Sequence, residues 1–282
     1  MLKALQRLRV VPLLAYERAI PRLSVTVGSR RIDVSTPAWF ARSLAYWRPS
    51  WKTQLIGHYL ARREGLFIDV GANIGQTLLD YISCSPTGGY RGFEPSLDSA
   101  SNVSRLIKKN RLENCQILPV ALSDSTGLTT LFERHVGDSC ATMVEDLRPS
   151  FQNDARAIAT LELDNLDLSP IAVIKIDVEG AELAVLEGMR RTLRSGSIPV
   201  VCEILRRDSR SPAKEYEQRI SSLEALLRDI GYVALLIEKT SDLSKVAALK
   251  PVEAFPLEPF TNTTRELNDY LLCPADSIPI LP

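Results

Sequence analysis

The sequence has few cysteines, and their spacing suggests neither a metal site nor a disulfide framework. Its five cysteines form no Cys-x-x-Cys pair and are scattered along the chain: Cys84, Cys115, Cys140, Cys202 and Cys273. A structural zinc site or a disulfide-stabilised fold is therefore not expected. We expect reduced thiols in a cytoplasmic protein instead. The sequence also has no apolar run long enough to span a bilayer and no recognisable cleavable signal peptide.

The sequence has no excess of charge of either sign. Lys and Arg together number 34, as do Asp and Glu, so the formal net charge is zero. A nucleic-acid partner is therefore not expected, because such proteins usually carry a basic surface. Hydrophobic residues make up 45% of the 282 residues, which suits one large α/β domain with a modest extension.

The first twenty residues combine apolar and basic side chains. Leu2, Leu5 and Leu8 alternate with Lys3, Arg7 and Arg9. Such a pattern is typical of a short amphipathic helix on a membrane surface, which would make the protein peripheral at the membrane. A helix packed on the domain, or a frayed terminus, is the favoured interpretation, since Pro12 would interrupt a long helix. The oligomeric state is not determined by the sequence.

Residues 1–64 are predicted to form an N-terminal extension of helices and a short hairpin. Residues 23–34 alternate between apolar and polar around Gly28-Ser29, which predicts the hairpin, and residues 50–63 predict a helix ended by Gly65. Aromatic residues gather between these segments: Trp39, Phe40, Tyr46, Trp47 and Trp51. They suit either an acceptor site for sugars or lipids or a hydrophobic seam against the core.

Residues 65–282 are predicted to form the main domain. Strands are predicted at residues 66–70, 90–93, 115–121, 172–176, 199–204, 232–237 and 269–273. Helices are predicted at residues 75–83, 97–110, 181–193 and 213–230. This alternation predicts an α/β fold with a doubly wound, mostly parallel sheet, to which the C-terminal strand adds an antiparallel edge. Residues 122–170 interrupt it as an insertion with strands at 129–133 and 159–163, and residues 241–268 are expected to be a surface loop.

A glycine loop follows the first strand of this domain. The segment Phe67-Ile-Asp-Val-Gly-Ala-Asn-Ile-Gly75 has the spacing G-x-x-x-G, so it does not match the dinucleotide fingerprint G-x-G-x-x-G. Glycines allow a sharp turn and close approach to a ligand, and the following helix points its N-terminus at that ligand. The pattern fits the looser loop that holds the methionine end of S-adenosylmethionine. The predicted contacts are Asp69, Gly71, Ala72, Asn73 and Gly75.

Two further strand ends extend this prediction. Glu94, in Gly92-Phe-Glu-Pro95, stands at the tip of the second strand. An acidic residue at this position accepts hydrogen bonds from ribose hydroxyls. The third strand ends in Ala121, Leu122, Ser123 and Asp124. The first three are predicted to lie beside an adenine plane. Asp124 either accepts a hydrogen bond from the adenine amino group or starts a turn.

The segment from Ile174 to Gly188, Ile-Lys-Ile-Asp-Val-Glu-Gly-Ala-Glu-Leu-Ala-Val-Leu-Glu-Gly, is the most distinctive part of the chain. Together with the glycine loop, Phe93-Glu-Pro95 and Val120-Ala-Leu-Ser-Asp124, it resembles the FkbM family of methyltransferases over about residues 65–205. The resemblance implies a class I methyltransferase (Rossmann-like) fold and S-adenosylmethionine as methyl donor. Family members mostly methylate hydroxyl oxygens, so the resemblance implies a small-molecule, glycan or glycolipid acceptor.

The same segment supplies candidates for the reaction itself. A base or a hydrogen-bond acceptor helps an aliphatic hydroxyl to attack a methyl group. Asp177, at the strand tip, is the first candidate, Glu179 the second, and His135 in the insertion the third. Glu179 also has a structural explanation as an acid near a helix start.

Three alternatives remain open at this stage. Asp177, Glu179 and Glu203 suit a divalent ion as well as separate tasks, although no metal site is predicted. A nicotinamide oxidoreductase would use a similar sheet, but the chain shows no Tyr-x-x-x-Lys pair. A non-catalytic nucleoside-binding protein is the third alternative.

Overall fold

The structure, a computed structural model, describes residues 23–35, 38–84, 86–134, 138, 140–145, 147, 154–209, 211–261 and 267–279. The amphipathic segment 1–20 and His135 lie outside the described residues, so the predictions made for them stay predictions. Among the helices that are described, none is both long and apolar enough to cross a membrane.

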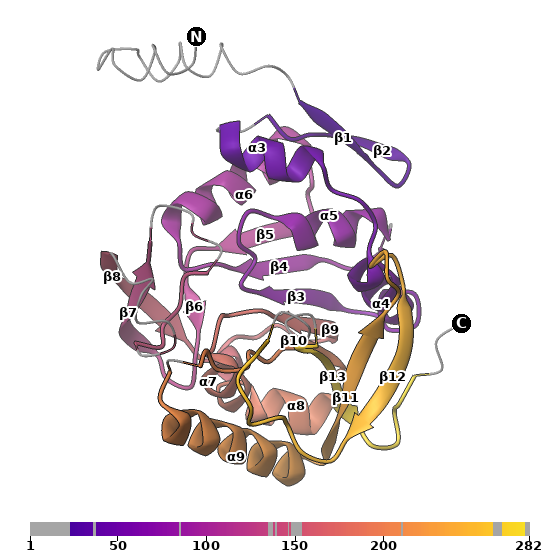
Figure 1. Cartoon of the computed structure of the whole chain (residues 1–282). Coiled ribbons are helices and arrows are strands. Elements are labelled where there is room, and N and C mark those ends of the chain that lie inside the picture. Colours follow the sequence, from indigo (N-terminus) through magenta and orange to yellow (C-terminus); the bar gives the residue numbers. More distant parts are fainter. Residues whose placement is uncertain are drawn as a thin grey trace.

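The described chain is built around one eight-stranded sheet in the order β12-β11-β13-β10-β9-β3-β4-β5 (Figure 1). The strands are β3 (Leu66–Val70), β4 (Tyr90–Phe93), β5 (Cys115–Leu118), β9 (Ile171–Ile176), β10 (Val200–Glu203), β11 (Tyr232–Lys239), β12 (Val246–Val252) and β13 (Asp269–Pro274). β5, β4, β3, β9 and β10 pair in parallel, whereas β13 is antiparallel to both β10 and β11. The predicted α/β fold with an antiparallel C-terminal strand is confirmed.

Helices cover both faces of this sheet, because its central strands are apolar on both sides. One face packs against α3 (Ala38–Ala45), α4 (Trp51–Leu60), α5 (Gln76–Ser83) and α6 (Leu97–Lys109). The other face packs against α7 (Glu182–Glu187), α8 (Arg190–Gly196) and α9 (Ala213–Ile230). In β3, Phe67 enters the first core and Ile68 and Val70 the second. By the same alternation, Asp69 and Lys175 point toward the face of α4 and α5.

The helix predicted over residues 181–193 is two helices, α7 and α8. α7 ends at Gly188, where a Cβ atom would collide with the carbonyl oxygen of Ser123. α8 then starts anew because the carboxylate of Asp164 accepts the backbone N–H groups of Arg191 and Thr192, each at 2.8 Å. A tertiary contact and a cap from a distant turn therefore decide this break.

The surface loop predicted over residues 241–268 is wrong for its first part, because Val246–Val252 forms β12. This strand pairs antiparallel with β11 at the edge of the sheet, and Pro251 stands opposite Leu235. Proline is tolerated at such an edge because one side of the strand has no partner to receive an N–H. Most of β12 is half-buried or exposed and lacks a clear alternation, so its sequence resembles a loop.

The predicted insertion forms a second, three-stranded sheet in the order β6-β8-β7. Its strands are β6 (Ala121–Leu122), β7 (Gly127–Glu133) and β8 (Asp154–Leu161). The strand predicted over residues 115–121 therefore ends at Leu118, and Ala121 already belongs to the second sheet. In Figure 1 this sheet stands to the left of the main sheet, beside the ends of its central strands.

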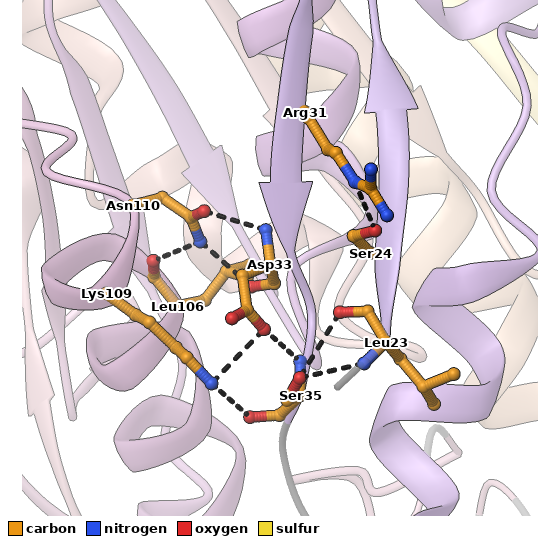
Figure 2. A network of polar contacts seen from close by, with 8 residues as sticks. All are labelled: Leu23, Ser24, Arg31, Asp33, Ser35, Leu106, Lys109 and Asn110. Carbon is orange, nitrogen blue, oxygen red and sulfur yellow. Dashed lines mark hydrogen bonds and ion pairs between the residues drawn. The ribbon is translucent and has the colours of Figure 1, made fainter. Parts of the chain in front are cut away.

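The described part of the N-terminal extension begins with the predicted hairpin, β1 (Ser24–Val27) and β2 (Arg30–Asp33). Figure 2 shows how it is attached to the end of α6. The N–H of Asp33 donates to Oδ1 of Asn110 at 2.8 Å, and Nδ2 of Asn110 donates to the carbonyl of Asp33 at 2.9 Å. Lys109 adds an ion pair with the Asp33 carboxylate at 3.1 Å. The hairpin and the main domain are thus fastened by a reciprocal pair of hydrogen bonds.

Candidate functional site

A cavity of about 540 Å³ opens at the carboxyl ends of the parallel strands. Ligands of open α/β sheets bind at this edge. The strand ends and loops of the main sheet supply these lining residues: Val70, Gly71, Ala72, Asn73, Phe93, Glu94, Pro95, Lys175, Asp177, Val178, Glu179 and Glu203. The second sheet and its loops add Ala121, Leu122, Leu131, Asp138, Cys140, Ala141 and Met143.

The glycine loop is held in a conformation that its sequence requires. Gly71 has φ +76°, and a Cβ atom there would collide with the carbonyl oxygen of Asp177. The N–H groups of Gly71 and Ala72 donate to the carbonyl of Phe93, at 2.9 and 3.1 Å. Asn73 follows with φ +45°, in the left-handed region that asparagine tolerates. The loop therefore brings bare backbone to the cavity wall.

Glu94 lies at the end of β4 and is buried against the same loop. Its Oε2 accepts the N–H of Asn73 and its Oε1 accepts the N–H of Ser96, both at 2.8 Å. Burial raises the pKa of Glu94 to about 7 despite these two donors. Each carboxylate oxygen keeps a lone pair for a further donor, as a ribose diol would provide.

Asp69 and Lys175 form a buried ion pair beneath the loop. Asp69 is fully buried, accepts the hydroxyl of Tyr90 at 2.6 Å and pairs with Lys175 at 3.2 Å. Nζ of Lys175 also donates to the carbonyl of Gly71 at 2.7 Å. Burial works against the charge of Lys175, but Asp69 and Asp177 raise its pKa above the ordinary value. Asp69 itself does not line the cavity, so it supports the loop from below.

Asp177 follows β9 and exposes 27% of its side chain. Two ammonium groups face it, with Lys52 at 3.6 Å and Lys175 at 3.7 Å from Oδ2. Burial would raise the pKa of Asp177, but these two lysines and a hydrogen bond with Glu203 lower it to about 2. Burial and the Asp177 charge instead raise the pKa of Glu203 to about 9. The two lysines therefore favour the ionised form of Asp177, and the charge of Asp177 favours the protonated form of Glu203.

Glu179 lines the cavity in a turn rather than in the strand. β9 ends at Ile176, and Glu179 has φ +52°. Its carbonyl accepts the hydroxyl of Thr142 at 2.6 Å, which ties the turn to the insertion. The structure thus brings Glu179 to the same cavity as Asp177. Among the described residues, no cluster of three or more His, Cys, Asp or Glu side chains is arranged to hold a metal ion.

The residues predicted to lie beside an adenine are divided by the structure. Ala121 and Leu122 line the cavity. Ser123 and Asp124 do not, because the chain has turned away: the N–H of Ser123 donates to Leu161 and its carbonyl faces Gly188. Gly75 also does not line the cavity. It precedes α5 as its N-terminal cap, with φ +97°. These three residues therefore do not line the cavity, and ligand contacts by them stay predictions.

The extension and α5 supply further lining residues that had not been predicted for the site: Arg48, Ser50, Lys52, Gln76, Thr77 and Asp80. Asp80 gave the clearest signal, because a lone carboxylate stands among apolar residues in Leu78-Leu-Asp-Tyr-Ile82. Trp47 and Trp51 line the cavity while remaining mostly buried, whereas Tyr46 is 71% exposed and Phe40 enters the core. Phe40 thus fits the hydrophobic seam, whereas an acceptor site at Trp47 and Trp51 stays a prediction.

Comparison with known proteins identifies the family. The model of the FkbM methyltransferase domain matches residues 69–234, which is more than half of the chain. The chain therefore belongs to the FkbM methyltransferase domain family. This is a class of S-adenosylmethionine-dependent methyltransferases, and S-adenosylmethionine is the cofactor that fits the glycine loop and Glu94. A comparison with curated protein sequences gives no match.

Solved structures of the same general fold are similar to the chain at low sequence identity. The FkbM methyltransferase of Methylobacillus flagellatus is 15% identical with a TM-score of 0.48; the match covers 84% of this chain and 50% of that protein. The chain thus spans half the length of that structure. A methyltransferase of Aquifex aeolicus is 10% identical, with coverages of 73% and 94% and a TM-score of 0.40. An O-methyltransferase of Thermotoga maritima is 12% identical, with coverages of 89% and 83% and a TM-score of 0.38.

Proposed function

We propose that this protein transfers a methyl group from S-adenosylmethionine to a hydroxyl oxygen of a sugar, a glycolipid or another small metabolite. One observation carries the proposal: the ionised Asp177 lines the same cavity as the glycine loop and Glu94. A carboxylate beside a methyl-donor site suits an acceptor that carries a proton on the attacking atom.

Bound S-adenosylmethionine supplies a methyl group on a cationic sulfur, which is already activated for in-line displacement. The residues of the chain therefore mainly align the two reactants. Glu94 would accept hydrogen bonds from the ribose hydroxyls, and the backbone of Gly71 to Asn73 would hold the amino-acid end. Ala121 and Leu122 provide an apolar surface for the adenine.

Asp177 accepts the hydrogen bond of the acceptor hydroxyl and orients its lone pair. A carboxylate with so low a pKa is a weak base toward a neutral alcohol. The proton becomes strongly acidic, however, as the oxygen gains its bond to the methyl group. Transfer of that proton to Asp177 late in the displacement is then favourable, and solvent in the cavity removes it afterwards. Glu179 is the second candidate for this position, and His135 the third.

The first prediction tests donor and acceptor together. Wild-type protein should bind S-adenosylhomocysteine in a calorimetric titration and should transfer labelled methyl from S-adenosylmethionine to a member of a glycan and lipid-linked acceptor panel. Asp177→Asn should lower kcat/KM about 100-fold, because it removes the proton acceptor, while leaving S-adenosylhomocysteine affinity nearly unchanged. Asp276→Asn, at an exposed turn outside the cavity, serves as the matched control.

Two outcomes would reject the proposal. Wild-type turnover by Asp177→Asn removes the assigned role of Asp177. Failure of wild-type protein to bind S-adenosylhomocysteine, together with tight binding of a nicotinamide dinucleotide, would favour the oxidoreductase alternative. Methyl transfer to any acceptor eliminates the non-catalytic alternative, and transfer to nitrogen would replace the hydroxyl in the proposal.

A further inference from the structure

One wall of the cavity is built by the segment before α4, by the first turn of α4 and by α5. We call Trp47, Trp51, Lys52 and Asp80 the acceptor wall, because none of them belongs to the residues that the proposed function assigns to the cofactor. Thr53, in the first turn of α4, connects it by donating its hydroxyl to Asp80. Three of its members come from the extension, so the extension completes the site.

Asp80 is the unusual member of the acceptor wall. The residue is only 5% exposed, yet it lines the cavity. Its Oδ1 accepts both the indole N–H of Trp47, at 3.1 Å, and the hydroxyl of Thr53, at 2.5 Å. Its Oδ2 has no hydrogen-bond partner among the described residues, and it is not one of the fully enclosed atoms that lack a partner. Because Asp80 lines the cavity and Oδ1 already accepts two hydrogen bonds, Oδ2 is the oxygen available to a ligand there.

A carboxylate in this position calls for a donor from a ligand. Burying a charged oxygen without a hydrogen bond costs free energy, so the site gains when a ligand hydroxyl supplies one. Burial raises the pKa of Asp80 to about 6 although both Thr53 and Trp47 donate to it. The carboxylate is thus still mainly ionised at neutral pH and able to accept.

The charges around the acceptor wall favour a neutral ligand. Lys52 pairs with Asp177 at 3.6 Å and also interacts electrostatically with Asp269, Glu203 and Asp80. Its Nζ lies 5.6 Å from the ring centroid of Trp51. The carboxylates are therefore already compensated by a resident ammonium group, so a cationic ligand gains little and an anionic one meets Asp80 and Asp177. Trp47 and Trp51 are mostly buried, which leaves room for ring edges rather than broad stacking.

We propose that Asp80 binds a second hydroxyl of the acceptor, so that the substrate is a neutral polyol such as a sugar ring. This inference rests on the proposed function: one hydroxyl reacts beside Asp177, and another donates to Oδ2 of Asp80. Two separate acceptor points on one cavity require at least two donors on one ligand. The acceptor wall thus selects a polyhydroxylated ring over a simple alcohol, an amine or a phosphorylated sugar.

Asp80→Asn separates this role from a structural one. The asparagine Oδ1 can still accept from Trp47 and Thr53, while its amide N–H₂ replaces the open oxygen and donates instead of accepting. Protein saturated with S-adenosylhomocysteine would be titrated with methyl hexopyranosides, methyl hexosaminides and hexose 6-phosphates. The readout is the indole N–H resonance of Trp47 in a ¹H–¹⁵N spectrum, assigned with Trp47→Phe, together with saturation-transfer signals from the sugar.

Neutral glycosides should shift the Trp47 resonance of the wild type and of Asp276→Asn. Asp80→Asn should weaken this binding at least tenfold, while its melting temperature and its affinity for S-adenosylhomocysteine stay within error of the wild type. The inference is overturned if no neutral glycoside binds, if Asp80→Asn binds it equally well, or if amino or phosphorylated sugars bind more tightly. In each of these cases, binding of S-adenosylhomocysteine by the wild type would still support the proposed methyl transfer. Failure of the wild type to bind S-adenosylhomocysteine would instead contradict the proposed function itself.

Discussion

Asp177 and Glu203 show how the pKa values of neighbouring carboxyl groups shift in opposite directions. Both lie at strand ends on the face toward α4, but Lys52 and Lys175 approach Asp177 alone within 4 Å. The ammonium groups stabilise the charge of Asp177, and that charge in turn keeps the proton on Glu203. Glu203 can then donate a hydrogen bond that fixes the Asp177 carboxylate for the acceptor.

Glu203→Gln should change how stability depends on pH. In the unfolded chain Glu203 loses its proton near its ordinary pKa of 4.5, whereas in the folded protein it retains the proton until about pH 9. The unfolded state therefore binds fewer protons over this range, and the free energy of unfolding falls as pH rises, by at most about 1.4 kcal/mol per pH unit from this group. Glutamine can donate a hydrogen bond to Asp177 but does not titrate. The free energy of unfolding of the variant should therefore not show this decrease with rising pH.

Urea unfolding of both proteins at pH 5, 7 and 9 measures the difference. We expect similar free energies of unfolding at pH 5 and a more stable Glu203→Gln protein at pH 9. Parallel pH profiles for the two proteins would show that Glu203 is ionised in the folded state at neutral pH and would contradict the shared proton.

At the scale of elements, the attachment of the β1–β2 hairpin to α6 illustrates the difference between buried and exposed polar contacts. Asn110 makes the reciprocal pair with the backbone of Asp33 and also donates to the carbonyl of Leu106 at 2.9 Å (Figure 2). The ion pair of Lys109 with Asp33 is more exposed. Backbone groups that lose their partners cost more than an exposed ion pair contributes.

Asn110→Ala should therefore lower the free energy of unfolding by about 1–3 kcal/mol, whereas Lys109→Met should lower it by less than about 1 kcal/mol. Hydrogen exchange of the hairpin amides should accelerate in the first variant only. Affinity for S-adenosylhomocysteine should not change, because neither residue lines the cavity. Equal effects of the two substitutions would show that the hairpin does not depend on the Asn110 bonds.

At the scale of the whole molecule, the described extension and the main domain share one hydrophobic core. Val27, Leu44 and Leu55 of the extension belong to the same cluster as Phe67 and Val201 of the central sheet. The boundary at residues 64 and 65 therefore marks a change in pattern along the sequence rather than a division between two packed units.

A fragment of residues 65–282 should consequently fail to fold cooperatively. Removing the extension exposes the apolar face of α5 and of the sheet, and hydrophobic burial is the main favourable term in folding. We expect binding of a hydrophobic dye, loss of near-ultraviolet circular dichroism and no binding of S-adenosylhomocysteine. A fragment that unfolds cooperatively and binds the ligand would show that the extension is dispensable.

The sequence alone determined the donor side of this protein. A strand, a glycine loop and an acid one βαβ unit later are local patterns, so Gly71, Asn73 and Glu94 were predicted where the structure places them in the cavity wall. The alternation of strands and helices likewise fixed the sheet, because buried parallel strands are recognisable as apolar runs. Edge strand β12 escaped detection because an exposed edge leaves little periodicity in its sequence.

Only the tertiary structure decided which charged groups surround Asp177 in the cavity. Lys52 and Asp80 belong to helices on either side of the glycine loop in the sequence, and Asp177 and Glu203 lie more than 90 residues beyond that. Nothing local in these segments indicates that Lys52 faces Asp177 or that Asp80 keeps one oxygen open. Packing of the extension across α5 and β9 brings these charges together, and their mutual electrostatics then sets which carboxyl group holds a proton.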